Sequence, residues 1–206
     1  MVNKVIDYCE RLIQDSRCST LPFHDLRHTR EVASNASYLS KIHSLNSAEK
    51  ELLQIAAWFH DTGFSEAYKG HEDSSKKIAY DFLVKQGASA CVIKAILCCI
   101  DGTKMPQKPM SKYAKILCDA DLFHLSTSEF FSKKPLLRQE WETFCNLKVN
   151  DLEWHQLNLK FLKEHQYQTS YGQKVLAKGK LQNILKAEQL MECFQKQNQW
   201  TKNLAS

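Results

Sequence analysis

The sequence has few of the residues that interrupt helices. Its 206 residues include only six glycines and four prolines, which leaves little material for the turns of a β-rich fold. Apolar residues recur with helical spacing along nearly the whole chain, and no strand-like alternation competes with that pattern. No apolar run reaches the roughly 18 residues that a transmembrane helix needs. We therefore expect an all-α protein without a membrane-spanning segment.

The chain also lacks the cysteine spacing of a disulfide scaffold or a structural zinc site. Its eight cysteines include no CxxC pair. The N-terminal segment is amphipathic and charged throughout, unlike a secretion signal. Four cysteines lie in apolar periodic segments, where a free thiol behaves as a small hydrophobe: Cys91, Cys98, Cys99 and Cys118. These features predict reduced, buried cysteines in a cytoplasmic protein.

A concentrated basic stripe, which is typical of nucleic-acid-binding proteins, is missing as well. The formal charge is +5 and the isoelectric point is near 8.7, but the lysines and arginines are spread along the chain. We therefore do not expect nucleic acid as the main partner. A small phosphate-bearing ligand fits this charge better.

The helical pattern predicts a single domain over residues 1–206 with a C-terminal helical extension over about 135–197. The segment DGTKMPQKPM, from Asp101 to Met110, holds two of the four prolines and is expected to be a loop. Pro135 is expected in the first turn of the next helix. The apolar periodicity predicts helices over these approximate ranges: 5–13, 26–42, 51–60, 72–85, 89–100, 111–121, 135–144, 151–163 and 173–197.

The run Glu51–His60 is apolar on nearly all sides, as expected of a central helix surrounded by others. Gly63 is expected to end this helix, because glycine commonly adopts the left-handed conformation just past a helix end. His60 and Asp61 then occupy the last turn. Adjacent helical side chains point about 100° apart, so both reach one metal only where the helix loosens.

Ionisable residues at inward positions indicate a metal site. Burying the adjacent pair His60 and Asp61 costs free energy unless a metal or a charged partner compensates. Asp121 is also expected on an inward face, and no lysine or arginine lies within its segment CDADLFHL. A metal is the simplest compensation for these groups.

With His28, these residues resemble the H…HD…D signature of the HD superfamily. The order of the residues, the adjacent His-Asp pair at the end of an apolar helix and the ADL tripeptide around Asp121 carry the likeness, over roughly residues 20–126. The resemblance implies an HD-type helical bundle. It also implies that one divalent metal is bound by four residues: His28, His60, Asp61 and Asp121.

The opening FHDLRHT is similar to the YHNxxHT of small bacterial HD phosphohydrolases, with Phe23 and Asp25 in place of Tyr and Asn. Two imidazoles and two carboxylates suit Mn, Fe, Co, Ni, Zn or Mg. Four protein ligands on an octahedral ion leave two positions for water or substrate, which indicates a catalytic site.

His71 and Glu72 resemble the HE pair that follows the HD pair in several members of the superfamily. The resemblance implies proton transfer, in which Glu72 takes a proton from water and His71 protonates a leaving oxygen or contacts a phosphate. Glu72 also suits the first turn of a helix, where a carboxylate is favoured by the dipole. Asp119 is a second-choice acidic residue, which either orients a ligand or water or lies exposed on its helix.

Several cationic and aromatic residues are candidates for contacts with a substrate. His24 lies four residues before His28 and shares its face if both are helical. Lysine and arginine make charge-assisted bonds to phosphate oxygens, and each is also a common surface residue. The candidates for phosphate contacts are Arg27, Lys69, Lys104 and Lys180, and the aromatic tail residues that could line a pocket are His165, Tyr167 and Tyr171.

The leading hypothesis from the sequence is a metal-dependent phosphohydrolase that acts on a phosphomonoester or phosphodiester, with a nucleotide or related small molecule as the substrate. One alternative is an HD-type di-iron oxygenase, although such sites generally need two further histidines after the HD pair. The other is a non-catalytic nucleotide-binding regulatory module. The long final helix leaves a homodimer open.

Overall fold

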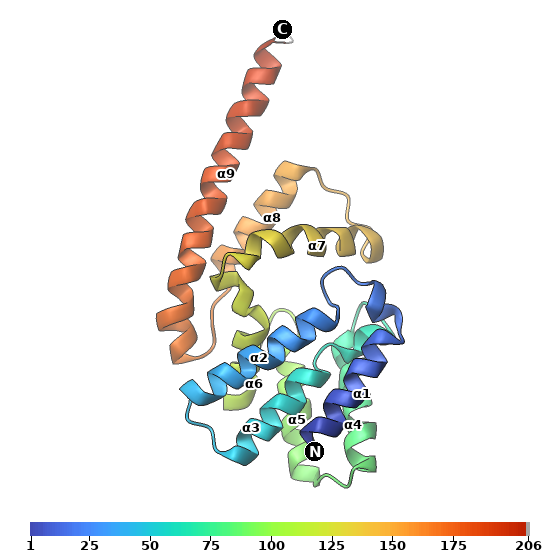
Figure 1. Cartoon of the computed structure of the whole chain (residues 1–206). Helices are drawn as coiled ribbons and strands as arrows, with labels where there is room; N and C mark the ends of the chain where they lie inside the picture. The colour runs from blue at the N-terminus through green and yellow to red at the C-terminus, as the bar shows by residue number, and fades with distance from the viewer. Residues whose placement is uncertain (205–206) are drawn as a thin grey trace. The chain divides into compact units, whose positions relative to one another are not determined.

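A computed structural model describes residues 1–204, with side chains up to Cys193 (Figure 1). All regular elements within that range are helices, so the prediction of an all-α fold is confirmed. No helix among the described residues is long and apolar enough to cross a membrane.

The chain forms two compact units. The first consists of Met1–Phe123 with Gln168–Tyr171, and the second consists of His124–Tyr167 with the chain from Gly172 onward. The expected single domain over residues 1–206 remains a prediction. The helices of the first unit are α1 (Val2–Gln14), η1 (Arg17–Thr20), α2 (Leu26–Ile42), α3 (Ser47–Phe59), η2 (Thr62–Ser65), α4 (His71–Lys85), α5 (Ala90–Thr103) and α6 (Lys112–Asp121).

Helix α3 lies at the centre of the first unit and packs against α1, α2 and α5. It begins with a capping box, in which the Asn46 side chain accepts from the Glu49 backbone and the Glu49 carboxylate accepts from the Asn46 backbone. Its apolar side chains are almost completely buried, as the sequence pattern predicts. They include Leu53, Ile55, Ala56, Ala57 and Phe59.

The loop before α6 is shorter than the sequence predicts, because α5 continues to Thr103 and includes Gly102. A Cβ at Gly102 would lie 3.1 Å from the Cβ of Ala114 and 3.3 Å from the Cα of Pro109. Glycine therefore allows both the loop and α6 to pack closely against the last turn of α5.

The 3₁₀ turn η3 (Leu122–Ser126) begins in the first unit and ends in the second. It leads to α7 (Glu129–Phe144), which begins before the predicted helix. Pro135 consequently lies inside α7, not in its first turn. The hydroxyl of Thr127 accepts from the backbone N–H of Glu129 at 3.3 Å and marks the earlier start. Helix α8 (Asp151–Glu164), the π-helical segment η4 (Gly172–Leu176) and α9 (Ala177–Leu204) complete the second unit.

Helices α8 and α9 pack against each other within the second unit. Trp154 of α8 is buried and meets Trp141 of α7 edge to face, with 5.7 Å between the ring centroids. Helix α9 continues to Leu204, beyond the predicted end near Gln197, because no glycine or proline interrupts this stretch.

The cysteines are all free, and their burial differs from the prediction at one helix. Cys99 and Cys118 are buried and Cys98 is partly buried, but Cys91 is exposed. Cys91 lies in the first turn of α5, where it does not share the buried face that begins with Ile93.

Candidate metal centre

Helix α2 supplies His28 to the site, and its N-cap fixes the position of this residue. The Asp25 carboxylate accepts from the backbone N–H groups of Arg27 at 2.9 Å and His28 at 3.1 Å. Asp25 therefore caps the helix one turn before the imidazole is presented. Asp25 departs from the family pattern at this position, and an Asp directly before an amphipathic helix is also a readable N-cap signal.

His60 and Asp61 follow the end of α3, so neither lies in its last helical turn as predicted. His60 is the C-cap residue, and Asp61 precedes the 3₁₀ turn η2. The Nδ1 atom of His60 lies 2.8 Å from the carbonyl of Ala57. If Nδ1 carries the proton and donates it to that carbonyl, Nε2 presents a lone pair to the site.

Gly63 does not have the left-handed conformation that the sequence predicts. The glycines with positive φ among the described residues are Gly70 and Gly87. A Cβ at Gly63 would instead lie 1.8 Å from the carbonyl oxygen of His71 and 2.5 Å from the backbone nitrogen of Ser75. The glycine is needed because the start of α4 passes directly against it.

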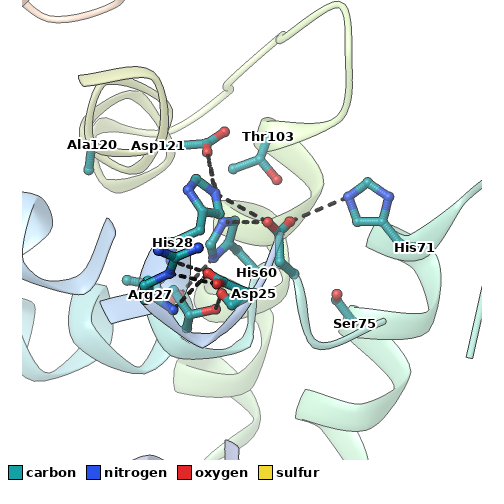
Figure 2. A network of polar contacts seen from close by, with 12 residues as sticks. Asp25, Arg27, His28, His60, His71, Ser75, Thr103, Ala120 and Asp121 are labelled. Carbon is teal, nitrogen blue, oxygen red and sulfur yellow. Dashed lines mark hydrogen bonds and ion pairs between the residues drawn. The ribbon is translucent and has the colours of Figure 1, made fainter. Parts of the chain in front are cut away.

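His28 of α2, His60 at the end of α3 and Asp121 at the end of α6 come together (Figure 2). Asp61, the fourth predicted ligand, directly follows His60. The Asp61 Oδ2 atom lies 3.3 Å from Nε2 of His28 and 3.1 Å from Nε2 of His60. The Asp121 Oδ1 atom lies 3.3 Å from Nε2 of His28 and 3.8 Å from Nε2 of His60. Ligand atoms of His28, His60 and Asp121 all lie within 4.8 Å of one another.

The residues fit a divalent metal because two buried nitrogen atoms converge without hydrogen-bond partners. The Nε2 atoms of both His28 and His60 are buried, and neither has a partner with hydrogen-bond geometry. The two side chains are only 4% and 1% exposed. Buried polar groups are normally paired, so two orphaned nitrogens beside two carboxylates are best explained by a cation between them.

The histidines and carboxylates of the cluster shift one another's pKa values. Burial lowers the pKa of His28, but Asp121 and Asp61 outweigh burial and raise it to about 9. Burial raises the pKa of Asp61, but His60, His28 and His71 hold it well below its usual value. A divalent metal that binds these nitrogens would displace any proton that they carry.

His71 lies on the other side of Asp61. Its Nε2 atom is 3.4 Å from Asp61 Oδ1 and 3.6 Å from Glu72 Oε1. Its Nδ1 atom lies 3.2 Å from the carbonyl of Tyr68. Its ring stacks on buried Phe64 with 3.7 Å between centroids and an interplanar angle of 16°. Packing and the carbonyl thus hold the imidazole with Nε2 toward Asp61.

Glu72 lies in the first turn of α4 and is 7% exposed, so both sequence interpretations of this residue fit its position. His24 stacks on the same Phe64 ring, with 4.4 Å between centroids. Its ring centroid lies 6.3 Å from that of His71. The structure therefore brings His24, His71 and Glu72 to one side of the metal cluster.

Asp119 makes different contacts from Asp121. It is completely buried and accepts from the backbone N–H groups of Gln168 at 2.6 Å and Thr169 at 3.0 Å, and from the Thr169 hydroxyl at 2.6 Å. The expectation of an exposed carboxylate is therefore wrong, whereas a ligand-orienting role remains a prediction. Asp119 anchors the returning segment Gln168–Tyr171 to α6.

The remaining predicted substrate residues have partners within the protein. Arg27 is largely exposed and pairs with Asp25 at 2.8 Å. Lys104 pairs with Asp73 of α4 at 3.2 Å. Lys180 belongs to the second unit, where it is buried and donates to the carbonyl of His165. A substrate contact by any of these residues remains a prediction.

Two of the suggested aromatic pocket residues lie in the second unit and one lies in the first. His165 and Tyr167 meet edge to face, with 4.7 Å between their ring centroids. The Tyr171 hydroxyl lies 2.8 Å from the hydroxyl of Tyr38 on α2.

Lys69 is exposed in the turn before α4. Asn35 was not predicted from the sequence. Its side chain donates to the carbonyl of Ala120, directly before Asp121, at 3.2 Å.

Comparison with protein families identifies the class to which this arrangement belongs. Residues 25–126 match the HD domain, and they include all four proposed ligands. The chain belongs to the HD superfamily, as the sequence resemblance predicts. Comparisons with curated proteins and with solved structures gave no match.

Proposed function

We propose that this protein is a metal-dependent phosphohydrolase that acts on a phosphomonoester or phosphodiester of a nucleotide or related small molecule. The observation that carries the proposal is the pair of buried, unpartnered Nε2 atoms of His28 and His60, which face the carboxylates of Asp61 and Asp121. This cluster lies within a domain of a superfamily whose members are typically metal-dependent phosphohydrolases.

Four side chains would hold one divalent metal: His28, His60, Asp61 and Asp121. Manganese, iron, cobalt, nickel, zinc and magnesium all accept such ligands. When bound, the metal supplies a Lewis acid for a phosphoryl oxygen and lowers the pKa of a water molecule. The burial of the cluster limits competing water at the ligand atoms.

His71 and Glu72 would handle protons beside this metal. The Nε2 atom of His71 can accept or donate a proton on the Asp61 side, and it lies 3.6 Å from the Glu72 carboxylate. Glu72 would receive a proton from the attacking water, and His71 would donate one to the leaving oxygen. His24 lies next to this pair and would contact the substrate.

The experiment combines elemental analysis of the purified protein with phosphate release from a panel of nucleotides and phosphoesters. We expect Asp61→Asn to lose the metal and to reduce turnover about 100-fold or more, because one ligand charge is removed. Asp81→Asn is the control, since Asp81 is an exposed carboxylate on α4. Full metal content and turnover in D61N would refute the ligand assignment.

The same panel separates the alternative functions. Tight nucleotide binding without conversion by the metal-loaded protein would favour a regulatory module. Two iron atoms per chain in the elemental analysis would favour an oxygenase instead.

A further inference from the structure

A buried amide approaches Asp121 from the loop between α5 and α6. Gln107 is half-buried in this loop, whereas its neighbours Pro106 and Lys108 are exposed. The loop is held at both ends, since Lys104 pairs with Asp73 at its start and Ser111 caps α6 at its end. Its backbone therefore directs Gln107 inward.

The two oxygens of Asp121 have different neighbours. Oδ1 faces the imidazoles of His28 and His60, whereas Oδ2 accepts from the Nε2 amide of Gln107 at 3.4 Å. This hydrogen bond is at the long end of the usual range, and catalytic-site hydrogen bonds often tighten when the ligand is present. A carboxylate accepts hydrogen bonds only, so the donor end of the amide must face it.

The oxygen of the same amide lacks a hydrogen-bond donor. The Oε1 atom of Gln107 is buried and has no hydrogen-bond partner. A buried acceptor without a donor destabilises the folded protein. In a protein whose other buried polar atoms are mostly paired, such an atom next to a ligand carboxylate indicates that a donor arrives with the bound ligand.

We propose that Gln107 is a positioning residue of the metal centre, which holds Asp121 so that Oδ1 points to the metal. The inference rests on the proposed function, because it takes Asp121 to be a metal ligand. Hydrogen bonds to the outer oxygen of a ligand carboxylate fix its orientation, and their loss typically weakens metal binding by about 10–100-fold.

The test uses Mn²⁺ alone and measures its affinity for the full chain by titration with electron paramagnetic resonance. We expect Gln107→Met, which keeps the side-chain length but removes the amide, to weaken Mn²⁺ binding by about 10–100-fold. Thermal unfolding of the metal-free protein should change little. If Q107M does not fold, Gln107→Ala is measured in the same way.

Gln54→Met is the matched control. Gln54 is also partly buried and donates its side-chain amide to a backbone carbonyl, that of Ala33, at 2.8 Å. We expect Q54M to bind Mn²⁺ with the affinity of the unmodified protein. A general effect of losing a buried amide would weaken both variants equally and would overturn the proposal.

Asp121→Asn tests the proposed metal site separately from the proposed role of Gln107. Loss of Mn²⁺ binding in D121N together with unchanged binding in Q107M would overturn the role of Gln107 and leave the proposed metal site standing. Unchanged binding in D121N would overturn the proposed metal site itself.

Discussion

Lys134 has an unusual charge environment for a lysine. Its Nζ atom lies 2.6 Å from Nδ1 of His155, and no carboxylate pairs with it among the described residues. Burial, followed by repulsion from Arg138, lowers the pKa of Lys134 from 10.5 to about 8. The folded protein therefore releases this proton at a lower pH than the unfolded chain does.

The direction of the resulting pH dependence follows from proton binding. Between pH 8 and pH 10.5 the unfolded chain holds more protons at Lys134 than the folded protein, so this residue makes the free energy of unfolding rise with pH. We expect the unmodified protein to gain stability relative to Lys134→Met over this range. Urea unfolding of both proteins at several pH values measures it, and a difference that stays constant with pH would contradict the lowered pKa.

The sequence identified single residues well where a chemical pattern surrounds them. His28, His60, Asp61 and Asp121 were chosen from burial and family resemblance, and the structure brings all four together. The partners of Asp119 could not be chosen in this way, because Gln168 and Thr169 are about 50 residues distant in the chain. Gln107 was missed because a glutamine in a loop carries no pattern of its own.

At the scale of elements, Gly63 determines how close α4 can approach the end of α3. We expect Gly63→Ala to destabilise the protein by about 3 kcal/mol, because its Cβ would collide with the backbone of His71. Gly70→Ala is the comparison, since a Cβ there meets open space but the φ angle is +73°. We expect it to cost about 1 kcal/mol. Urea unfolding compares the two, and an equal or smaller loss in G63A would contradict the close-approach argument.

Helix positions followed from apolar periodicity, but the reasons for helix ends did not. The sequence placed Gly63 at a left-handed turn, whereas the structure uses it for a contact with a segment further along the chain. The start of α7 was predicted late because Pro135 suits a first turn, whereas the structure places Pro135 in the interior of the helix. The local conformational preferences of glycine and proline do not reveal such tertiary contacts.

At the scale of the whole molecule, the thiols divide into accessible and protected groups. Cys91, Cys145 and Cys193 are exposed, Cys98 is intermediate, and four cysteines are buried: Cys9, Cys18, Cys99 and Cys118. Burial also raises the pKa values of the buried thiols, to about 12 for Cys99, so little reactive thiolate forms.

We expect a thiol reagent to modify the three exposed cysteines rapidly in the folded protein. The four buried cysteines should react only after unfolding in urea, because both access and ionisation are blocked. Mass spectrometry of the modified peptides identifies the sites. Rapid modification of Cys9 or Cys118 in the native protein would contradict the packing of the first unit.

The division into two compact units was not visible in the sequence, since helical periodicity continues through both of them. It depends on the short segment Gln168–Tyr171, which belongs with the first unit although the residues on either side belong with the second. The buried carboxylate of Asp119, two residues before Asp121, holds that segment. Composition and periodicity contain no information about a short segment that packs with a distant part of the chain.

The carboxylate of Asp61 is shared by two sets of imidazoles. Oδ2 faces His28 and His60, and Oδ1 faces His71. Electron density drawn toward a cation on one side is withdrawn from the bond on the other, so metal choice and the basicity of His71 are coupled through one side chain. Exchange of one metal for another should therefore change the pKa of His71, although His71 is not among the proposed metal ligands. Under the proposed function, the metal and the proton-donating His71 could therefore not be tuned independently.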